Sequence, residues 1–299
     1  MLDLNICESE RVMPKFLNQK QINQYKEKGF VSNLRIMDDD KIKIIRNHLE
    51  EFERKQGSPL HGSQRHKTHL LFPWLNDLVR DSNILDAIED LYGHNILCWT
   101  SNFFIKEAHD PGFVSWHQDS TYWGLSSPDV VTAWVALSPS NKNNGAMSVI
   151  PGTHTLDQIK HRDTYSKNNL LTRGQEIAAE VDESQAYALE LDAGEMSLHH
   201  VRIIHGSPPN NSDSRRIGFA IRYIPTYVKQ IEGDDSATLV RGEDTFNTFS
   251  HEPKPTIEME PAFVKLHQDI TDKSAKILYK GTKVDSYDAS LADPKVRSV

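Results

Sequence analysis

The chain has 299 residues, 37% of them hydrophobic, and a formal net charge of -8, a composition typical of a globular protein with a sizeable core. The acidic balance, with no lysine- and arginine-rich block, argues against nucleic acid and anionic lipid as partners. We expect no membrane span and no secretory signal, because no apolar run is long enough and the start lacks a basic segment before an apolar one. Two cysteines, Cys7 and Cys98, are too few for a disulfide framework and favour a reducing cytoplasm.

The first third of the chain has the apolar periodicity of helices. The pattern extends over residues 20–57 and 74–93, and each stretch closes on a glycine. From residue 95 onward, short runs rich in β-branched and aromatic residues alternate with turn residues and predict strands at 95–107, 130–138, 146–151, 186–191, 195–200 and 215–225. Asn144-Gly145, between two of these runs, is typical of a β-hairpin.

This order of elements predicts an α+β, mainly β protein whose core is a sandwich or barrel of sheets behind N-terminal flanking helices. We expect a single domain over 1–299, with a mainly helical flank at 1–94, a β core at 95–225 and a C-terminal extension at 226–299 that is helical and then tail-like from about residue 256. The polar stretch 153–185 is too long for a passive connection, and "NNLLTRGQEI" within it indicates an ordered cover over a pocket.

The tripeptide His-Gln-Asp occurs twice, at 117–119 and at 267–269. Residues two apart share one face of a strand, but they point roughly 200° apart on a helix and cannot chelate one ion there. The second copy has helical spacing, so we expect it on a solvated helix surface. The first copy lies between strand-like segments, where His117 and Asp119 can meet one cation; alternatively, the two side chains only hydrogen-bond each other. Two similar patterns are expected to be a helix surface and a loop, respectively: His48-Leu49-Glu50 and His161-Arg162-Asp163.

A second histidine, His205, ends another strand-like run and can complete a metal site. Two imidazoles and one carboxylate leave three positions open on an octahedral ion, which is the arrangement of non-haem Fe(II) oxygenases. The chain has no thiolate cluster that would indicate structural zinc.

The run "RRIGFAIRY" alternates between a bulky apolar face and a face that holds Arg216, Gly218, Ala220 and Arg222. The small residues leave room for a ligand beside Arg216, whose guanidinium can bind a carboxylate through two parallel hydrogen bonds. Arg215 has the opposite parity and is expected to form a surface salt bridge.

The segments "WHQDSTYWGL", "TAWVALSPSNKNNGAMSVIPGTH" and "HGSPPNNSDSRR" together resemble the phytanoyl-CoA dioxygenase family of Fe(II)/2-oxoglutarate oxygenases, over about residues 20–225. The resemblance implies a double-stranded β-helix, a distorted jelly roll of cupin-like type, with Fe(II) held by His117, Asp119 and His205. It also implies that three residues bind the co-substrate 2-oxoglutarate: Arg216 at its C5 carboxylate, Ser207 through its hydroxyl, and Trp134 as a wall of the pocket. Ser207 as a turn cap and Trp134 as core packing are the alternatives.

What the family does implies a reaction for this chain. Oxygen and 2-oxoglutarate would be consumed, succinate and carbon dioxide released, and an unactivated C–H bond of a small metabolite hydroxylated. Related halogenases replace the carboxylate ligand by a small residue, so Asp119 favours hydroxylation over chlorination. A zinc-dependent hydrolase and a cupin-like binding protein without catalysis are the alternatives, although the chain has no His-Glu-x-x-His helix.

Candidate substrate contacts lie on the strand before the metal pair, directly after that pair, and around the last ligand: Asn102, Lys106, Tyr122, Trp123, His200, Arg202 and Arg222. If their cationic groups face inward, they would suit an anionic or zwitterionic metabolite. No feature specific for coenzyme A is visible, so an acyl-CoA substrate is not implied by the family name.

Overall fold

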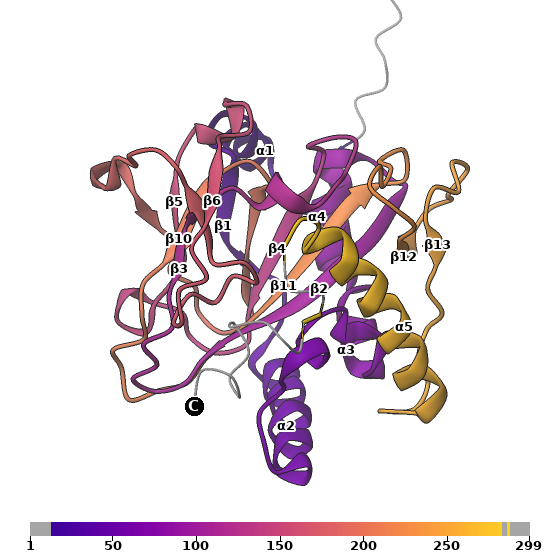
Figure 1. Ribbon diagram of the computed structural model, residues 1–299. Coiled ribbons are helices and arrows are strands. Elements are labelled where there is room, and N and C mark those ends of the chain that lie inside the picture. The colour runs from indigo at the N-terminus through magenta and orange to yellow at the C-terminus, as the bar shows by residue number, and fades with distance from the viewer. Residues whose placement is uncertain (1–12, 283–285, 288–299) are drawn as a thin grey trace, which may run out of the picture.

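The computed structural model describes residues 13–282 and 286–287, which form two facing sheets with helices outside the larger one (Figure 1). Cys7, the start of the chain and most of the expected tail lie outside the described residues. The helices are α1 (Gln19–Lys28), α2 (Asp39–Gln56), α3 (Pro73–Leu78), α4 (Ser82–Tyr92) and α5 (Pro261–Leu278). None of the helices in these described ranges is long and apolar enough to cross a membrane.

The larger sheet has seven strands, paired antiparallel except for its last two. In spatial order they are β1 (Phe30–Arg35), β9 (Glu195–His200), β4 (Val131–Ala136), β11 (Arg216–Pro225), β2 (Ile96–Lys106), β12 (Ser236–Arg241) and β13 (Ser250–His251). The smaller sheet contains β3 (Val114–His117), β10 (Ile204–Ser207), β5 (Ser148–Ile150) and β8 (Tyr187–Ala188), while β6 (His161–Asp163) and β7 (Gln175–Ile177) form a separate hairpin. The two facing sheets confirm the predicted jelly-roll core, and every predicted strand run contains a strand.

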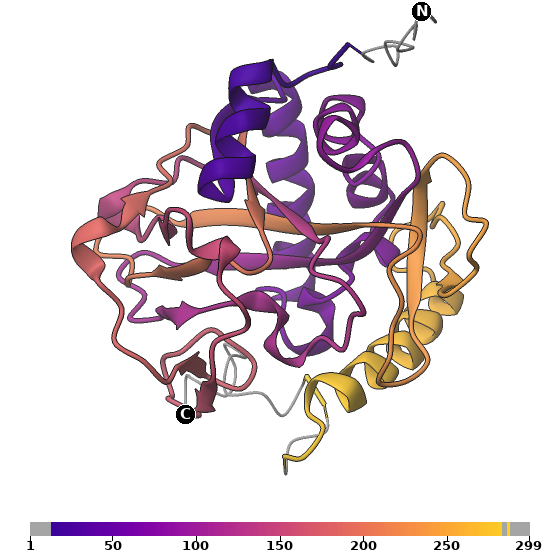
Figure 2. The ribbon, with the colours of Figure 1, turned by 90° about the horizontal axis from the view of Figure 1, so that it is seen from above.

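The hydrophobic core lies between the larger sheet and the N-terminal helices, which cover one side of that sheet (Figure 2). Ile217, Phe219, Ile221 and Tyr223 of β11 are fully buried in this core, as their parity predicted. The other face of β11 therefore looks toward the smaller sheet. Burial of these side chains fixes the register of β11, since a slip by one residue would exchange its two faces.

The prediction of helix over 20–57 is wrong for one segment. α1 ends at Gly29 and α2 begins at the N-cap Asp38, and between them β1 pairs with β9 at the edge of the larger sheet. Glycine at 29 adopts φ +80°, the left-handed conformation that ends a helix. The strand was missed because its pairing partner lies more than 150 residues away, so no local pattern marks it.

The hairpin predicted at Asn144-Gly145 is also wrong. Asn144 ends a 3-10 turn, Lys142–Asn144, and Gly145 follows with φ +78°. This turn carries the chain from β4 in the larger sheet to β5 in the smaller one. Left-handed backbone serves a turn cap as well as a hairpin, and only tertiary packing decides which strand pairs with which.

The second His-Gln-Asp copy lies on α5, as predicted, and cannot chelate. Asp269 is exposed, but His267 is buried and its Nε2 lies 2.7 Å from the carbonyl oxygen of His66. The expectation of a solvated surface is thus wrong for His267, because this side of α5 packs against the domain.

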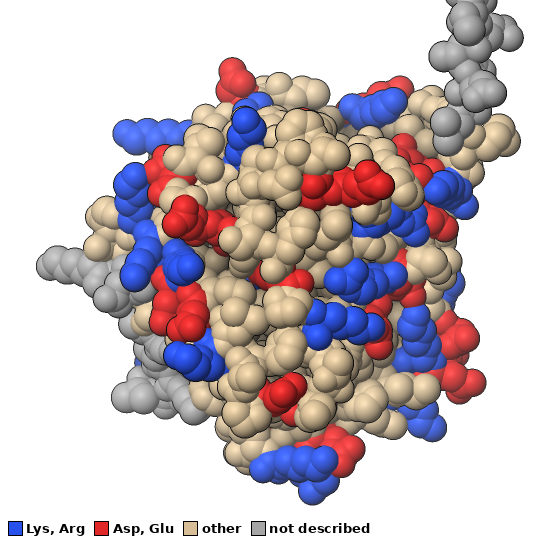
Figure 3. Space-filling model, turned by 90° about the vertical axis from the view of Figure 1, so that its right-hand side faces the viewer, with Lys and Arg blue, Asp and Glu red and all other residues tan. Residues whose placement is uncertain are grey.

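On the face of the molecule turned to the viewer in Figure 3, basic and acidic side chains are intermixed, so charge of one sign does not gather there.

Candidate active site

Three buried side chains lie close together beside the smaller sheet, two from β3 and the turn after it and one from β10. His117 and His205 are directly opposite each other on the paired strands β3 and β10. Asp119 follows two residues after His117, at the start of the 3-10 turn Asp119–Tyr122, and its N–H donates to the carbonyl of Val201 at 3.0 Å. The candidate ligand atoms of the three side chains all lie within 4.8 Å of one another.

Hydrogen bonds orient both imidazoles for metal binding. Nδ1 of His117 lies 2.9 Å from the carbonyl oxygen of Ser115, and Nδ1 of His205 lies 3.0 Å from that of Ile203. Because a carbonyl can only accept, each Nδ1 carries a proton and each Nε2 presents a lone pair. These two Nε2 atoms lie 3.3 Å and 4.0 Å from Oδ1 of Asp119. Two imidazole nitrogens and one carboxylate oxygen at such separations fit a single divalent ion of the Fe(II) type.

The protonation states also suit a cation. Burial lowers the pKa of His205 well below its usual value, with a further contribution from His117. Burial alone would raise the pKa of Asp119, but the charge of Arg222, 3.6 Å away, and the contacts with both histidines hold that pKa well below the usual range. His205 is therefore neutral and Asp119 ionised near neutral pH, which are the ligand forms that a metal requires.

A cavity of about 40 Å³, here called the inner cavity, lies beside the two histidines. Three of its walls are residues that the sequence singled out for the co-substrate: Trp134, Ser207 and Arg216. Thr132 and His199 line it as well. The structure thus brings these predicted residues together with the metal ligands.

Arg216 lies at the deep end of the inner cavity. Its Nη1 donates to the carbonyl of Gly145 and lies 3.4 Å from the hydroxyl of Ser207, while its Nε has no hydrogen-bond partner. Within the described part of the chain Arg216 forms no ion pair, and burial lowers its pKa to about 10, although the charge of Asp110 acts in the opposite direction. A buried guanidinium in this state fits a ligand carboxylate.

Lys106 lies behind Ser207 rather than on the wall of either cavity. Its Nζ donates to the hydroxyl of Ser207 at 2.5 Å and to the carbonyl of Pro208. Ser207 in turn donates to the carbonyl of Gly145 at 2.8 Å. The ammonium group of Lys106 is therefore held by Ser207 and Pro208, and the structure does not bring it to a substrate position.

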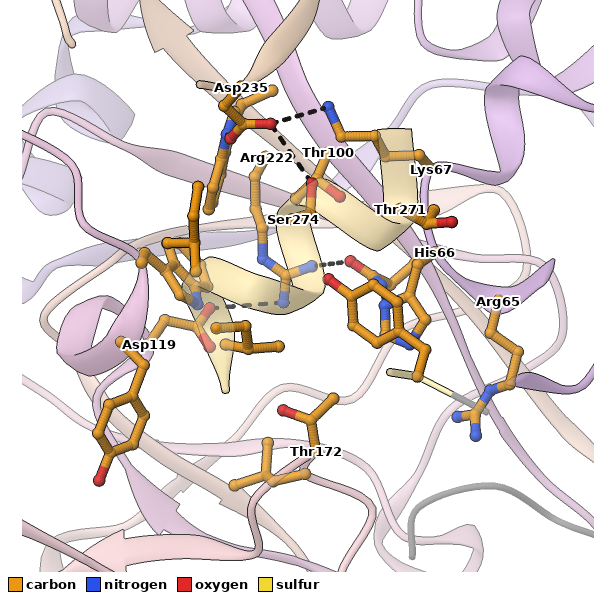
Figure 4. A pocket seen from close by; sticks show the side chains of 18 of the residues that line it. Arg65, His66, Lys67, Thr100, Asp119, Thr172, Arg222, Asp235, Thr271 and Ser274 are labelled. Atoms are coloured by element: carbon orange, nitrogen blue, oxygen red, sulfur yellow. Dashed lines mark hydrogen bonds and ion pairs between the residues drawn. The ribbon is translucent and has the colours of Figure 1, made fainter. Parts of the chain in front are cut away.

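A second cavity of about 110 Å³, here called the outer cavity, meets the inner one at Asp119 and Arg222, which line both (Figure 4). It contains the predicted contacts Asn102, Tyr122 and Trp123. Segments that the sequence did not assign to a pocket supply half of the remaining walls: Arg65, His66 and Lys67 before β2, and Asp235, Thr271, Ser274, Ile277, Leu278 and Tyr287 from the C-terminal extension.

The stretch 153–185, for which the sequence predicted a cover over a pocket, lies beside the outer cavity and is here called the cover. Leu170, Leu171, Thr172 and Gln175 from this cover line the cavity. Arg173 fastens the cover, since it pairs with Asp163 at 2.5 Å and donates to the carbonyl of Leu278 on α5 at 3.1 Å. The aromatic ring of Tyr122 lies 3.7 Å from the guanidinium of Arg173.

The expectation that His161-Arg162-Asp163 is loop is wrong, because these residues form β6. Nε2 of His161 accepts a hydrogen bond of 2.9 Å from the backbone N–H of Gln118, the residue between two metal ligands. The hydroxyl of Tyr122 donates to Asp163 at 2.9 Å. The pattern that looked like a chance match therefore ties the cover to the metal-binding segment.

Two predicted substrate residues, His200 and Arg202, lie outside both cavities. His200 faces the helix side, where its ring lies 6.5 Å from that of Tyr25, and Arg202 lies 3.6 Å from Asp157 at the surface. On β9 it is His199 that lines the inner cavity. The buried Met196 and Leu198 share the parity of His200, so the alternation of β9 could have identified His199.

Comparison with known proteins agrees with this architecture. The model of the phytanoyl-CoA dioxygenase (PhyH) family matches residues 12–218. The chain belongs to the phytanoyl-CoA dioxygenase family. The matched region contains every candidate metal ligand and the three co-substrate residues, whereas much of the outer cavity lies beyond it.

Individual members of the phytanoyl-CoA dioxygenase family resemble the chain to different degrees. A protein of Stutzerimonas stutzeri, named probable alpha-ketoglutarate-dependent hypophosphite dioxygenase, is 31% identical over 59% of this chain and 62% of its own length. L-Proline trans-4-hydroxylase of Streptomyces griseoviridis is 24% identical over 67% of this chain and 84% of its own. The chain thus spans about three fifths of the length of the first relative.

Among solved structures, the apo form of a non-heme monooxygenase called ThoJ is 30% identical, with a TM-score of 0.77, and the match covers 86% of this chain and 97% of that one. A nickel complex of ThoJ matches with 28% identity, a TM-score of 0.72 and the same coverage. The likeness to ThoJ therefore extends beyond the region of the family model and over most of the fold.

Proposed function

We propose that this protein is an Fe(II)/2-oxoglutarate-dependent dioxygenase that hydroxylates an unactivated C–H bond of a small metabolite. The observation that carries the proposal is that the His117–Asp119–His205 set lines the same cavity as Arg216, a buried guanidinium that forms no ion pair with any described residue. When bound, iron, 2-oxoglutarate and oxygen would supply the oxidising power, with succinate and carbon dioxide as co-products.

Different residues of the chain would position the iron and the co-substrate. His117, Asp119 and His205 would hold the iron, and Arg216, with the hydroxyl of Ser207, would receive the far carboxylate of 2-oxoglutarate. Trp134 lies against this arginine, with its ring 5.4 Å from the guanidinium, and would limit the co-substrate to one orientation. The side chain of Leu171 and other apolar walls would exclude water.

The outer cavity would hold an anionic or zwitterionic substrate. Arg65 and Arg222 offer positive charge there, and Asp119 and Asp235 offer negative charge. The names of two relatives refer to hypophosphite, an oxyanion, and to L-proline, a zwitterion. Asn102, Tyr122, Trp123 and Arg222 are the proposed substrate contacts that remain from the sequence.

Three further features enter the proposal. Asp119 occupies the position that a halide would need, which supports hydroxylation rather than halogenation. The described cysteine, Cys98, is a buried free thiol, which supports a reducing cytoplasm. The contact between the cover and α5 supports a single catalytic unit that includes the C-terminal extension.

The test is oxygen consumption and succinate release by purified protein with Fe(II) and 2-oxoglutarate, screened against amino acids, oxyanions and neutral analogues of each. We expect turnover that requires iron, rises strongly with one substrate class and yields a hydroxylated product. Zinc-supported hydrolysis without oxygen uptake would point to the hydrolase, and tight binding without turnover of any probe would point to a non-catalytic cupin-like protein.

A further inference from the structure

His66 lies on the wall of the outer cavity and belongs to no role described so far. Its ring stacks on that of Tyr287, with the ring centroids 3.7 Å apart. Its backbone is held firmly, because its carbonyl contacts His267 on α5 at 2.7 Å and its main chain bridges to that of Asn102. The imidazole is therefore preorganised at the cavity rather than mobile at the surface.

Asn102 links Arg222 to His66 through two hydrogen bonds, and the chemistry of the three side chains fixes the donor of each bond. A guanidinium has only donors, so Nη1 of Arg222, 2.6 Å from Asn102, must face the amide oxygen of that residue. The amide nitrogen of Asn102 then points to Nδ1 of His66, 2.5 Å away. An amide nitrogen only donates, and Nδ1 of His66 must accept.

An imidazole that accepts at Nδ1 carries its proton at Nε2. Burial lowers the pKa of His66 well below its usual value, as do the charges of Arg65 and Arg222, so the ring is neutral near neutral pH. Its Nε2 has no hydrogen-bond partner within residues 13–282 and 286–287, and it is not among the fully enclosed polar atoms that lack one. One N–H donor is thus left for a molecule in the cavity.

We propose that His66 is a specificity-determining residue that donates its Nε2–H to an oxygen acceptor of the substrate, such as a carboxylate or another oxyanion. The proposal rests on the proposed function and names the chemical group of the substrate that the outer cavity recognises. The proton is held on Nε2 of His66 by a series of polar contacts that runs Asp119–Arg222–Asn102–His66. In this series Arg222 links a metal ligand to the wall of the outer cavity. A substrate that presents a donor or an ammonium group at this point would meet an N–H and bind poorly.

The first experiment measures the tautomer by NMR. The full chain, with histidine labelled with nitrogen-15, is loaded with Zn(II) and 2-oxoglutarate, so that no turnover is needed. The resonances that disappear in His66→Gln belong to His66, and His94→Gln, at an exposed histidine, is the matched control. We expect a protonated Nε2 and a bare Nδ1 near neutral pH; a proton on Nδ1, or a doubly protonated ring, would overturn the proposal.

The second experiment replaces the side-chain amide of Asn102 by a carboxylate. In Asn102→Asp, position 102 can only accept from both neighbours, so the proton of His66 is expected to move to Nδ1 or the ring to become charged. An unchanged Nε2–H tautomer in this variant would show that Asn102 does not set the donor, and the argument from Arg222 would fail. Both experiments are independent of catalysis, so their outcome is separate from that of the proposed function.

The third experiment probes the acceptor with two small molecules of similar shape, isobutyrate and isobutylamine, added to the labelled Zn(II) protein with 2-oxoglutarate held saturating. We expect isobutyrate to shift the Nε2–H resonance of His66 with saturation, and isobutylamine to leave it in place. His66→Gln should weaken isobutyrate binding by about tenfold or more, because a hydrogen bond to a charged group is lost or misplaced. No shift with isobutyrate, or an equal shift with the amine, would overturn the proposal.

Discussion

The inner and outer cavities share Asp119 and Arg222 but are built from different parts of the chain. The inner cavity is lined mainly by strands, whose alternation places Arg216 and Trp134 on the inward face. The outer cavity is lined by the segment before β2, the cover and the C-terminal extension, which meet only through tertiary packing. The difference teaches that a metal and co-substrate site can be read from strand parity, whereas a substrate site assembled from loops and a terminal helix cannot.

The strongest test of the comparison removes Asp119, one of the residues that line both cavities. Asp119→Ala should lower iron affinity and 2-oxoglutarate turnover by more than about 100-fold, because a ligand is lost where even loss of a supporting contact costs up to about that factor. Iron binding and succinate release are measured with and without chloride. Asp269→Ala, in the other His-Gln-Asp copy, is the control and should behave as wild type; full activity of Asp119→Ala without chloride would refute the ligand assignment.

A change confined to the inner cavity should affect the co-substrate alone. Arg216→Gln removes a charge-assisted bond worth about 2–3 kcal/mol, so the KM for 2-oxoglutarate should rise roughly 30- to 150-fold. Arg215→Gln is the matched control, because Arg215 has the opposite parity and pairs with Glu53 at 2.7 Å and Glu107 at 2.9 Å, away from the cavity. Equal effects of the two variants on KM would contradict the proposed role.

The packing behind Arg216 can be tested by adding one methyl group. A Cβ at Gly218 would overlap the ring of Trp134. Gly218→Ala should therefore push Trp134 into the inner cavity, weaken 2-oxoglutarate binding and destabilise the fold by about 1–3 kcal/mol. Gly233→Ala, whose added methyl would meet Ile277 at an ordinary 3.4 Å, should change neither; calorimetric binding and thermal unfolding are the measurements.

A change at the cover of the outer cavity should uncouple the decarboxylation of 2-oxoglutarate from hydroxylation of the substrate. Binding of 2-oxoglutarate itself should not change. Arg173→Met breaks the pair with Asp163 and the bond to Leu278, so the cover should part from α5. We expect several-fold more succinate per hydroxylated product, with the KM for 2-oxoglutarate unchanged. Arg162→Met, which removes an exposed pair with Glu176 on the same hairpin, is the control; unchanged coupling in Arg173→Met would mean that the cover does not protect the reaction.

The smallest expected effect concerns the pH dependence of stability at α5. Burial lowers the pKa of His267 to about 4, partly offset by its bond to the carbonyl of His66, while an unfolded histidine titrates near about 6.5. Between these values the unfolded chain binds the proton and the folded one does not, so the unfolding free energy falls as the pH drops from about 6.5 toward 4. Urea unfolding of His267→Gln across this range should show a shallower fall; an equal slope would contradict the assignment.

The sequence predicted part of the inner cavity from local features, and the family resemblance supplied Ser207 and Trp134. Strand alternation gave the face of Arg216, and the spacing of His117 and Asp119 on extended backbone gave the metal pair. The same reasoning failed at His200, where the parity set by Met196 and Leu198 was not used. Lys106 was placed on the correct face of β2, but side-chain contacts with Ser207 and Pro208, which no pattern reveals, hold it away from the substrate side.

The outer cavity was largely hidden because its walls are brought together by distant contacts. His66 lies between two short 3-10 helices, Gly62–Arg65 and Thr68–Leu70, and α5 reaches it through His267, some 200 positions later. The sequence identified the cover, from its length and its embedded apolar residues, and four of the wall residues: Asn102, Tyr122, Trp123 and Arg222. A helix can be predicted from periodicity, but the face it presents to a pocket depends on what it packs against.

The position of those walls has a consequence for how such enzymes diversify. The region shared with the family ends at residue 218, while Asp235, Thr271 and Tyr287 close the outer cavity from beyond that limit. Exchanging this terminal portion between relatives could therefore redirect an enzyme to a new metabolite and leave its oxygen chemistry intact. The fold thus places part of the substrate wall on a stretch of the polypeptide that is separate from the metal ligands and the co-substrate residues.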